Sequence, residues 1–193
     1  MEERYGTRCC DGLRASNHVK AAPEDSPSGT ATSTPSLGET VQWVVFGLDT
    51  GRYAISLATV DRIVRAVYVT PLPLAPAIVL GAINVEGCVL PVFNVRRRFR
   101  LPERNINRAD HFLIARTAQR RVVLVIDAAQ GVLELPSHAV TDVASIAPGL
   151  AHIRGVITLE DGLVLIHDLE QFLSPDESHA LDEANIQEAS LAG

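Results

Sequence analysis

The sequence lacks the cysteine pattern of a disulfide-stapled or zinc-binding protein. It has three cysteines, Cys9, Cys10 and Cys88. An odd number cannot form an even disulfide framework, and the paired Cys-x-x-Cys spacing of a zinc site is absent. Cys88 lies in an apolar run, so we interpret it as a small core or strand residue, with a reactive thiol as the alternative.

Long hydrophobic runs are also missing. Runs such as residues 75–83 fall well short of the roughly 18 apolar residues that a membrane-spanning helix needs. The first thirty residues contain no apolar segment typical of a secretion signal. We therefore expect no insertion into a membrane and a cytoplasmic location.

An excess of basic residues is absent as well. Residues 1–40 carry four basic and six acidic side chains, residues 41–173 carry thirteen and twelve, and residues 174–193 carry none and five. A nearly neutral body with acidic ends argues against nucleic-acid binding, which needs a basic face. The one basic cluster begins with Arg96, Arg97 and Arg98, and we interpret it as a solvated face or a contact patch for a partner.

Motifs of catalysis and of cofactor binding do not occur. The chain has no glycine-rich phosphate loop, no nucleophile elbow, no His-Glu-x-x-His and no calcium loop. His111 follows Asp110 and His167 precedes Asp168, but neighbours in a strand point to opposite faces, so neither pair is placed as a catalytic dyad. We expect no enzyme activity, no cofactor and no metal.

What the sequence does contain is a set of short β-rich segments with turn signals between them. With 193 residues, of which 47% are hydrophobic, the chain can form one domain or two small ones. Turn signals every 8 to 12 residues favour small barrels or sandwiches, and so an all-β fold. The expected hairpins turn at Asp49-Thr50-Gly51, Glu86-Gly87, Ala118-Gln119 and Asp161-Gly162, and residues 94–99 are expected to form one helical turn.

The two ends of the chain differ from this body. Residues 1–40 include a stretch rich in Ser, Thr and Pro, and we expect a disordered leader there. Ser174-Pro175 followed by Asp176-Glu177 has the pattern of a helix N-terminus, which predicts a thin amphipathic helix from about Pro175 to about Glu188. The expected division is a leader (1–40), a β domain (41–173) and an acidic C-terminal helix or tail (174–193).

An internal repeat indicates two related halves. Residues 81–86 followed by 87–90 match residues 155–160 followed by 162–165, with Asp161 as one inserted residue. The copies lie 74 residues apart, so a duplicated strand-turn-strand unit is indicated, with chance similarity of two apolar hairpins as the alternative. Two small barrels would share a core, and the cleft between them would be a natural binding surface.

Together these segments resemble the CheW family of bacterial chemotaxis coupling proteins over about residues 41–173. The family pattern is close to GxxNLRGxxxPVxDLRxxF, and the chain matches it with Gly81, Asn84, Gly87, Pro91, Val92, Arg96 and Phe99. The resemblance implies two intertwined five-stranded barrels of the Src-homology-3 type. It also implies a non-catalytic cytoplasmic adaptor at receptor assemblies on the inner face of the membrane. Its partners would be the cytoplasmic tip of a chemoreceptor and the regulatory domain of a CheA-type histidine kinase.

The same resemblance implies which residues bind partners. Val60 and Val132 would be apolar contacts in a receptor groove, with ordinary core packing as the alternative. Gly81, Asn84 and Gly87 would shape the hairpin beside the groove, and for the glycines backbone geometry alone is the alternative, favoured at Gly87.

Departures from the family pattern add a hypothesis about specificity. The family usually has an acid at the position of Arg62 and an arginine at that of Glu86, so the two signs are exchanged. If the two residues face each other, they form an ion pair of inverted polarity, which we expect to alter partner choice. Asn94 stands where the family usually has an aspartate, so the positive charge of the basic cluster is less compensated. Residues 141–146 fit the family pattern poorly. A CheW-like module of a divergent motility, pilus or polar-localisation pathway is therefore the alternative function.

Overall fold

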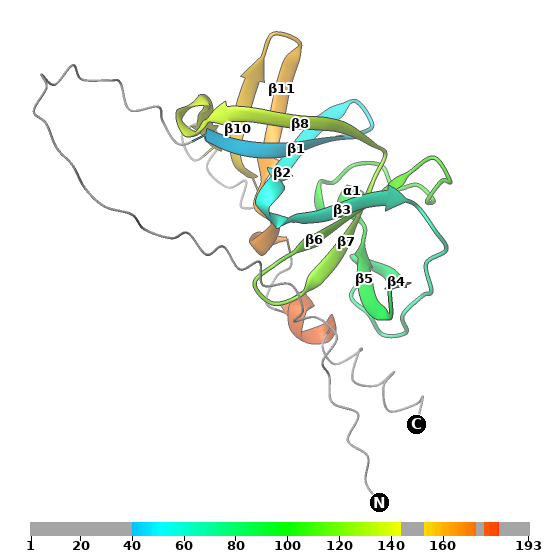
Figure 1. Cartoon of the computed structure of the whole chain (residues 1–193). Coiled ribbons are helices and arrows are strands. Elements are labelled where there is room, and N and C mark those ends of the chain that lie inside the picture. Colours follow the sequence, from blue (N-terminus) through cyan, green and yellow to red (C-terminus); the bar gives the residue numbers. More distant parts are fainter. Residues whose placement is uncertain (1–39, 144–152, 173–175, 182–193) are drawn as a thin grey trace, which may run out of the picture.

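The computed structural model describes residues 40–143, 153–172 and 176–181, and most of these residues lie in β-strands (Figure 1). The all-β expectation is therefore confirmed. The expected leader lies outside the described residues, apart from Thr40, with which the first strand begins. No helix in the described ranges is long and apolar enough to cross a membrane.

The strands form two sheets. The six-stranded sheet has the order β8 (Ala128–Pro136), β1 (Thr40–Leu48), β2 (Gly51–Ser56), β11 (Gly162–His167), β10 (Ile153–Leu159) and β9 (Val140–Asp142). The five-stranded sheet has the order β3 (Val60–Arg65), β6 (His111–Arg116), β7 (Arg121–Ile126), β5 (Cys88–Phe93) and β4 (Val79–Val85).

The two sheets are built from interleaved parts of the chain. The N-terminal hairpin β1–β2 pairs with β8 and β11, which come from the second half of the chain. The hairpin β6–β7 pairs with β3 and β5, which come from the first half. Both exchanges use a short parallel pairing, β11 with β2 and β5 with β7. The expected intertwined arrangement is confirmed.

Each sheet curls into a barrel because one bent segment reaches both of its edges. The chain from β8 to β9 bends at the 3-10 turn η2 (Ser137–Ala139) and supplies the two edges of the six-stranded sheet. In the other sheet, β3 is one edge, and Thr70, a few residues later, bridges to Ala82 in the opposite edge strand β4. Strand β9 therefore continues the segment that begins with β8, on the opposite edge of the sheet. Because this one segment forms two strands, the barrel has six strands and not the expected five.

The internal repeat is confirmed, but without an insertion. Every residue pair of the β4–β5 hairpin has a counterpart 74 positions later in the β10–β11 hairpin. For example, the pair of Val79 with Phe93 corresponds to the pair of Ile153 with His167. Both hairpins carry a register shift at the same place, before Gly81 and Gly155. Gly162 therefore corresponds to Cys88, and the expected insertion at Asp161 is wrong.

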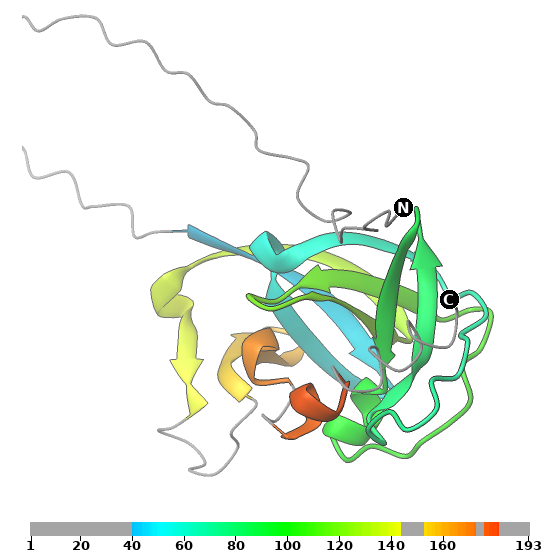
Figure 2. The same cartoon turned by 90° about the horizontal axis from the view of Figure 1, so that it is seen from below.

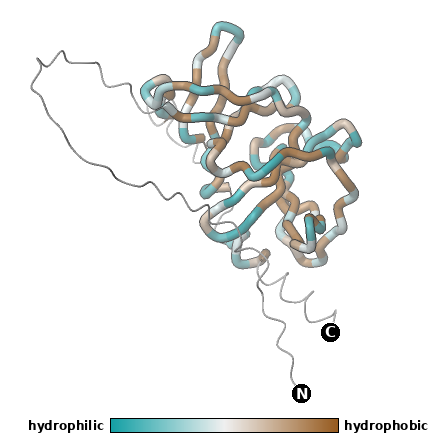
Figure 3. Tube along the Cα trace, viewed as in Figure 1, coloured by the Kyte–Doolittle hydropathy of each residue, from teal (hydrophilic) through white to brown (hydrophobic). Residues whose placement is uncertain are grey.

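The core lies between the barrels as well as inside each of them. Alternate residues of a strand face opposite sides, so Val44 and Phe46 of β1 pack into a shared central core, while Trp43 and Val45 face the interior of the six-stranded barrel. Strand β6 does the same, with Leu113 in the shared core. The interface between the barrels is thus filled by packed side chains, and the cleft expected there is not found among the described residues. Figure 3 shows hydrophobic residues along the strands and hydrophilic ones at hairpin tips.

Short helical segments complete the fold. Helix α1 (Val95–Arg98) begins at Asn94, whose side chain accepts a hydrogen bond from the Arg97 backbone N–H, as expected of a helical turn at residues 94–99. Residues 176–181 are helical, lie beside α1 and the 3-10 turn η4 (Leu169–Gln171), and bury Leu181 in the shared core (Figure 2). The remainder of the predicted C-terminal helix falls outside the described residues.

Candidate partner-binding surface

Arg62 and Glu86 face each other across the mouth of the five-stranded barrel. Arg62 lies in edge strand β3, and Glu86 lies in the turn after the opposite edge strand β4. The guanidinium donates two parallel hydrogen bonds to the carboxylate, Nη1 to Oε1 at 2.8 Å and Nη2 to Oε2 at 2.9 Å. These bonds lower the pKa of Glu86 and raise the pKa of Arg62. The ion pair joins the two barrel edges and leaves both charged groups within reach of a partner.

The turn that carries Glu86 is held by its own residues. The Asn84 side-chain oxygen accepts a hydrogen bond from the Gly87 backbone N–H at 2.9 Å. Glu86 and Gly87 have φ angles of 54° and 85°, so both occupy the left-handed region. A Cβ at Gly87 would meet nothing within 4 Å, so Gly87 is required for its backbone angle and not for space. Asn84 and Gly87 thereby aim Glu86 toward Arg62.

Gly81 has a different role from Gly87, because another backbone segment lies against it. A Cβ at Gly81 would stand 2.1 Å from the Thr70 carbonyl oxygen, and the φ angle is 147°. Thr70 is held there by two hydrogen bonds with Ala82, at 2.9 and 2.8 Å. A Cβ at the counterpart Gly155 would stand 2.5 Å from Val140 Cγ1 and 3.0 Å from the Thr141 carbonyl oxygen. Both glycines let the segment that closes their barrel approach the hairpin.

The two valines expected to contact a receptor lie in different sheets. Val60 begins β3, is half-buried and packs against the shared core. Val132 lies in β8, opposite Val44, with 53% of its surface exposed. Core packing thus accounts for part of the Val60 side chain, whereas Val132 is available at the surface. Arg62, Gly81, Asn84, Glu86 and Gly87 are gathered at the β3 and β4–β5 edges.

The structure differs from the sequence prediction at Arg96. Only 6% of this residue is exposed, so it cannot belong to a solvated contact patch. Its guanidinium binds Asp49 Oδ2 at 2.8 Å, in the β1–β2 turn, and Asp127 Oδ2 at 2.6 Å, between β7 and β8. The hydrogen bond from Arg96 lowers the pKa of Asp49. Arg96 therefore ties the two barrels together from the inside.

Asp127 extends this network to a second arginine. Arg104 binds Asp127 Oδ1 at 2.6 Å and both carboxylate oxygens of Asp110, at 2.8 and 2.7 Å. Burial alone would raise the pKa of Asp110, but the hydrogen bonds from Arg104 and from the Asn107 backbone outweigh it, and the pKa is lowered. The hydrogen bond that Arg104 donates to Asp110 raises the pKa of Arg104.

Arg97 and Arg98 are also compensated individually. Arg97 binds Glu103 at 2.8 Å and donates to the Ala77 carbonyl oxygen at 2.6 Å. Arg98 pairs with Glu177 and lies over the Phe172 ring. The expectation that Asn94 leaves these charges less compensated is wrong, because acids from other segments supply the negative charge. A contact role for the half-exposed Arg97 stays a prediction.

His167, one of the two histidines beside aspartates, has structural surroundings. His167 is buried and stacks on Phe99, with ring centroids 3.8 Å apart. Asp168 accepts a hydrogen bond from the Glu170 backbone N–H at 3.0 Å and begins η4. Within the described residues, no group of three or more His, Cys, Asp or Glu side chains is placed to hold a metal ion.

Sequence reasoning missed an exposed apolar stretch between β3 and β4. Val67, Tyr68 and Leu74 are 56%, 83% and 79% exposed. Leu74 has a φ angle of 61°, which is unusual for a residue with a branched side chain. The available signal was a run of apolar residues broken by prolines, which indicates a loop but does not indicate which side chains face outward.

Comparison with known proteins places this fold in a family. The family model described as "CheW-like domain" matches residues 42–177. Two similar curated proteins are a chemotaxis protein CheW of Treponema pallidum, 27% identical over 149 residues (74% of this chain and 88% of that protein), and one of Klebsiella aerogenes, 26% identical over 159 residues (80% and 96%). A crystal structure of the scaffolding protein TtCheW from Thermoanaerobacter tengcongensis superimposes with a TM-score of 0.66 at 21% identity, over 72% of this chain and 96% of that one.

Proposed function

Because the chain belongs to the CheW-like domain family, we propose that it is a non-catalytic adaptor of a chemotaxis-type signalling pathway. It couples the cytoplasmic tip of a chemoreceptor to the regulatory domain of a CheA-type histidine kinase. The observation that carries this proposal is the family match over residues 42–177, supported by curated relatives that bear the name chemotaxis protein CheW. The adaptor acts in the cytoplasm, at receptor assemblies on the inner face of the membrane, without a cofactor and without contacting nucleic acid.

Most of the candidate receptor surface lies at the rim of the five-stranded barrel, and Val132 adds a contact from β8 of the six-stranded barrel. It comprises Arg62 and Glu86 as charged groups, Asn84 and Gly87 as the residues that hold the turn, and Gly81 as the residue that admits the closing segment. Val60 and Val132 are the apolar contacts. Because these groups stand on strands and tight turns, the surface is rigid before a partner arrives, and little ordering entropy is lost on binding.

Weak contacts suit such an adaptor. An interface of about 1,200 Å² or less gives reversible assembly, and many copies side by side in an array raise the overall avidity. The rigid core shared by the two barrels keeps the receptor surface and a second surface for the kinase at a fixed separation. The protein therefore works as a spacer with two docking sites and not as a catalyst.

The experiment that tests this function uses the full chain with a receptor cytoplasmic fragment and a CheA-type kinase from the same organism. Gel filtration should show a ternary complex, and kinase autophosphorylation should respond to the receptor only when the chain is present. Heat-denatured chain is the control. If neither protein is retained and kinase activity is the same with and without the chain, the adaptor function is wrong.

A second candidate function is a CheW-like module of a divergent motility, pilus or polar-localisation pathway. The inverted Arg62–Glu86 pair favours it, because a partner that complements the usual polarity would meet like charges here. Affinity purification from the native cell discriminates the two candidates. Retention of a pilus-type or polar protein in place of a transmembrane chemoreceptor would support the second.

A further inference from the structure

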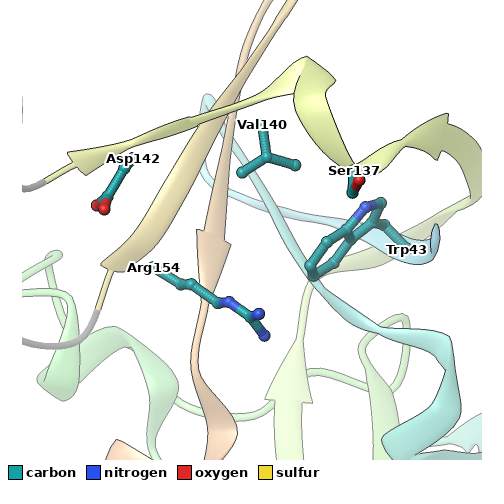
Figure 4. A pocket seen from close by; sticks show the side chains of 5 residues that line it. All are labelled: Trp43, Ser137, Val140, Asp142 and Arg154. Atoms are coloured by element: carbon teal, nitrogen blue, oxygen red, sulfur yellow. The ribbon is translucent and has the colours of Figure 1, made fainter. Parts of the chain in front are cut away.

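A pocket of about 220 Å³ opens on the six-stranded barrel, away from the Arg62–Glu86 rim. It is lined by Trp43 of β1, Ser137 of η2, Val140 and Asp142 of β9, and Arg154 of β10 (Figure 4). One wall is the indole, another is the Val140 side chain, and the Arg154 side chain extends from β10 toward the indole. The volume accommodates one medium-sized side chain.

Trp43 brings a hydrogen-bond donor without an acceptor. The residue is 4% exposed, and its indole Nε1 has no hydrogen-bond partner. Leaving a buried donor unsatisfied costs free energy of folding, so nearly all such groups in native proteins are paired. Figure 4 shows the indole nitrogen on the edge of the ring near Ser137, and an acceptor that reaches this edge would remove the cost.

Arg154 brings a positive charge that no carboxylate of the described residues neutralises. It is exposed, and no ion pair or hydrogen bond of its guanidinium is present within residues 40–143, 153–172 and 176–181. Arg52, in the same sheet, shows the contrast, since it pairs with Asp161 at 2.7 Å. The guanidinium is a planar fork that matches a carboxylate, so its open state favours an acidic ligand.

The pocket therefore offers more donors than acceptors. The indole N–H and the guanidinium only donate, the Ser137 hydroxyl can donate or accept, and Asp142 is the one acidic side chain among the lining residues. Asp142 is already engaged in an interaction, and Figure 4 shows it on the side of the pocket away from Trp43. A carboxylate bound between Arg154 and Trp43 is thus favoured over a cation, and the apolar walls favour an aliphatic stem behind it.

We propose that this pocket binds the side chain of a glutamate from a partner protein. A protein source fits better than a free metabolite, because the pocket is open and its one guanidinium would hold a small molecule only weakly, whereas a polypeptide adds contacts outside the pocket. The neighbouring strand β9 also points to a polypeptide: it pairs with β10 and, within the described residues, with no strand on its other side. A partner segment along β9 would deliver its glutamate into the pocket. This proposal does not rest on the receptor surface at the other barrel.

The single tryptophan of the chain makes the test specific. In ¹⁵N-labelled full chain, the Trp43 indole N–H gives one signal that reports on this pocket. The probe is acetyl-glutamate N-methylamide, which carries one carboxylate and no charged termini, and acetyl-glutamine N-methylamide is the matched neutral probe. We expect a saturable shift of the indole signal with the glutamate probe, at an affinity about tenfold or more above that of the glutamine probe.

Variants test whether Arg154 supplies the positive charge that binds the carboxylate of the probe. Arg154→Gln should weaken binding of the glutamate probe about tenfold or more, and Arg65→Gln, at an exposed position of the other barrel, should leave it unchanged. Asp142→Asn should strengthen it. In each variant, unchanged backbone amide signals of strands outside the pocket report that the fold is intact.

Several outcomes overturn the proposal. They are equal binding of the two probes, full binding by Arg154→Gln, and an indole signal that does not move with the glutamate probe. A stronger response to acetyl-lysine N-methylamide would make the ligand cationic. An affinity for glutarate about tenfold or more above that for the glutamate probe would show that the ligand is a free dicarboxylate and not a protein side chain.

Discussion

Arg96 Nη2 and Asp127 Oδ2 lie 2.6 Å apart, and this ion pair joins the helix after β5 to the crossover from β7 to β8. Asp127 Oδ2 also accepts a hydrogen bond from the Asp49 backbone N–H at 2.8 Å, at the tip of the β1–β2 hairpin. One carboxylate therefore meets segments of both barrels. The arrangement makes the relative position of the barrels depend on a small number of charged atoms.

Replacing Arg96 by methionine should lower the free energy of unfolding by about 2–3 kcal/mol, because Asp49 and Asp127 lose the guanidinium that joins them and, of its two arginines, Asp127 keeps only Arg104. Urea unfolding followed by circular dichroism measures the change. Arg97→Met is the control, since Arg97 binds the exposed Glu103, and it should cost about 1 kcal/mol or less. Equal losses in the two variants would contradict a clamping role for Arg96.

Stability should fall in acid partly through Asp110. The pKa of this carboxyl is lowered in the folded protein, so the folded state binds fewer protons than the unfolded state, and protonation favours unfolding. The contribution is complete above about pH 5 and is lost as the pH falls through the ordinary carboxyl pKa of about 3.9 toward the folded value.

The Asp110→Asn variant tests this directly. It should be less stable than the native protein at pH 7, and the difference should shrink steadily between about pH 5 and pH 3. Asp161→Asn, at an exposed turn, is the control. A difference that stays constant over this range would mean that the Asp110 charge contributes nothing.

The loss of stability on replacing each of three glycines by alanine should depend on what the added Cβ meets. Gly81→Ala is expected to cost more than about 3 kcal/mol, because the Cβ would overlap the Thr70 carbonyl in a backbone that has no room to move. Gly87→Ala should cost about 1 kcal/mol, from its positive φ alone. Gly155→Ala should fall between them, since its nearest neighbour is a valine methyl. Thermal unfolding of the three variants gives the order, and a Gly81 variant no worse than the Gly87 variant would refute the contact.

Exchanging the charges of Arg62 and Glu86 should separate recognition from stability. The double variant Arg62→Glu with Glu86→Arg should keep the melting temperature nearly unchanged, because the pair is exposed and re-forms with opposite polarity. Its affinity for a receptor fragment should change about tenfold or more. Calorimetric titration measures this, with Arg65→Glu on the same strand as the control. Single variants as stable as the double variant, with unchanged partner binding, would eliminate the pairing as a determinant of specificity.

Local chemistry made the strands and turns predictable. The Asp49-Thr50-Gly51 and Glu86-Gly87 turns depend on residues that are adjacent in sequence, and both occur where they were expected. The alignment of Gly87 with Gly162 failed because it matched residue types. In the structure the turn is formed at residues 160–161, and Gly162 already begins β11.

Long-range contacts were not predictable in the same way. Arg96 looks like one of several surface arginines, and its burial depends on acids 47 and 31 positions away. Trp43 likewise reads as an ordinary strand residue, and nothing nearby in sequence indicates that Arg154 shares its pocket. The facing of Arg62 and Glu86 followed from the family resemblance, because the intervening 24 positions carry no local sign of it.

Because the strands are interleaved, the two barrels can be completed only in a fixed order as the chain leaves the ribosome. All strands of the five-stranded barrel have emerged once β7 is synthesised, whereas β1 and β2 must wait for β8 to β11. During that interval the first hairpin exposes the apolar face that bears Trp43 and Val45. Neither half of the gene encodes a barrel by itself, so recombination that splits it near the middle yields two chains that must find each other before either is complete.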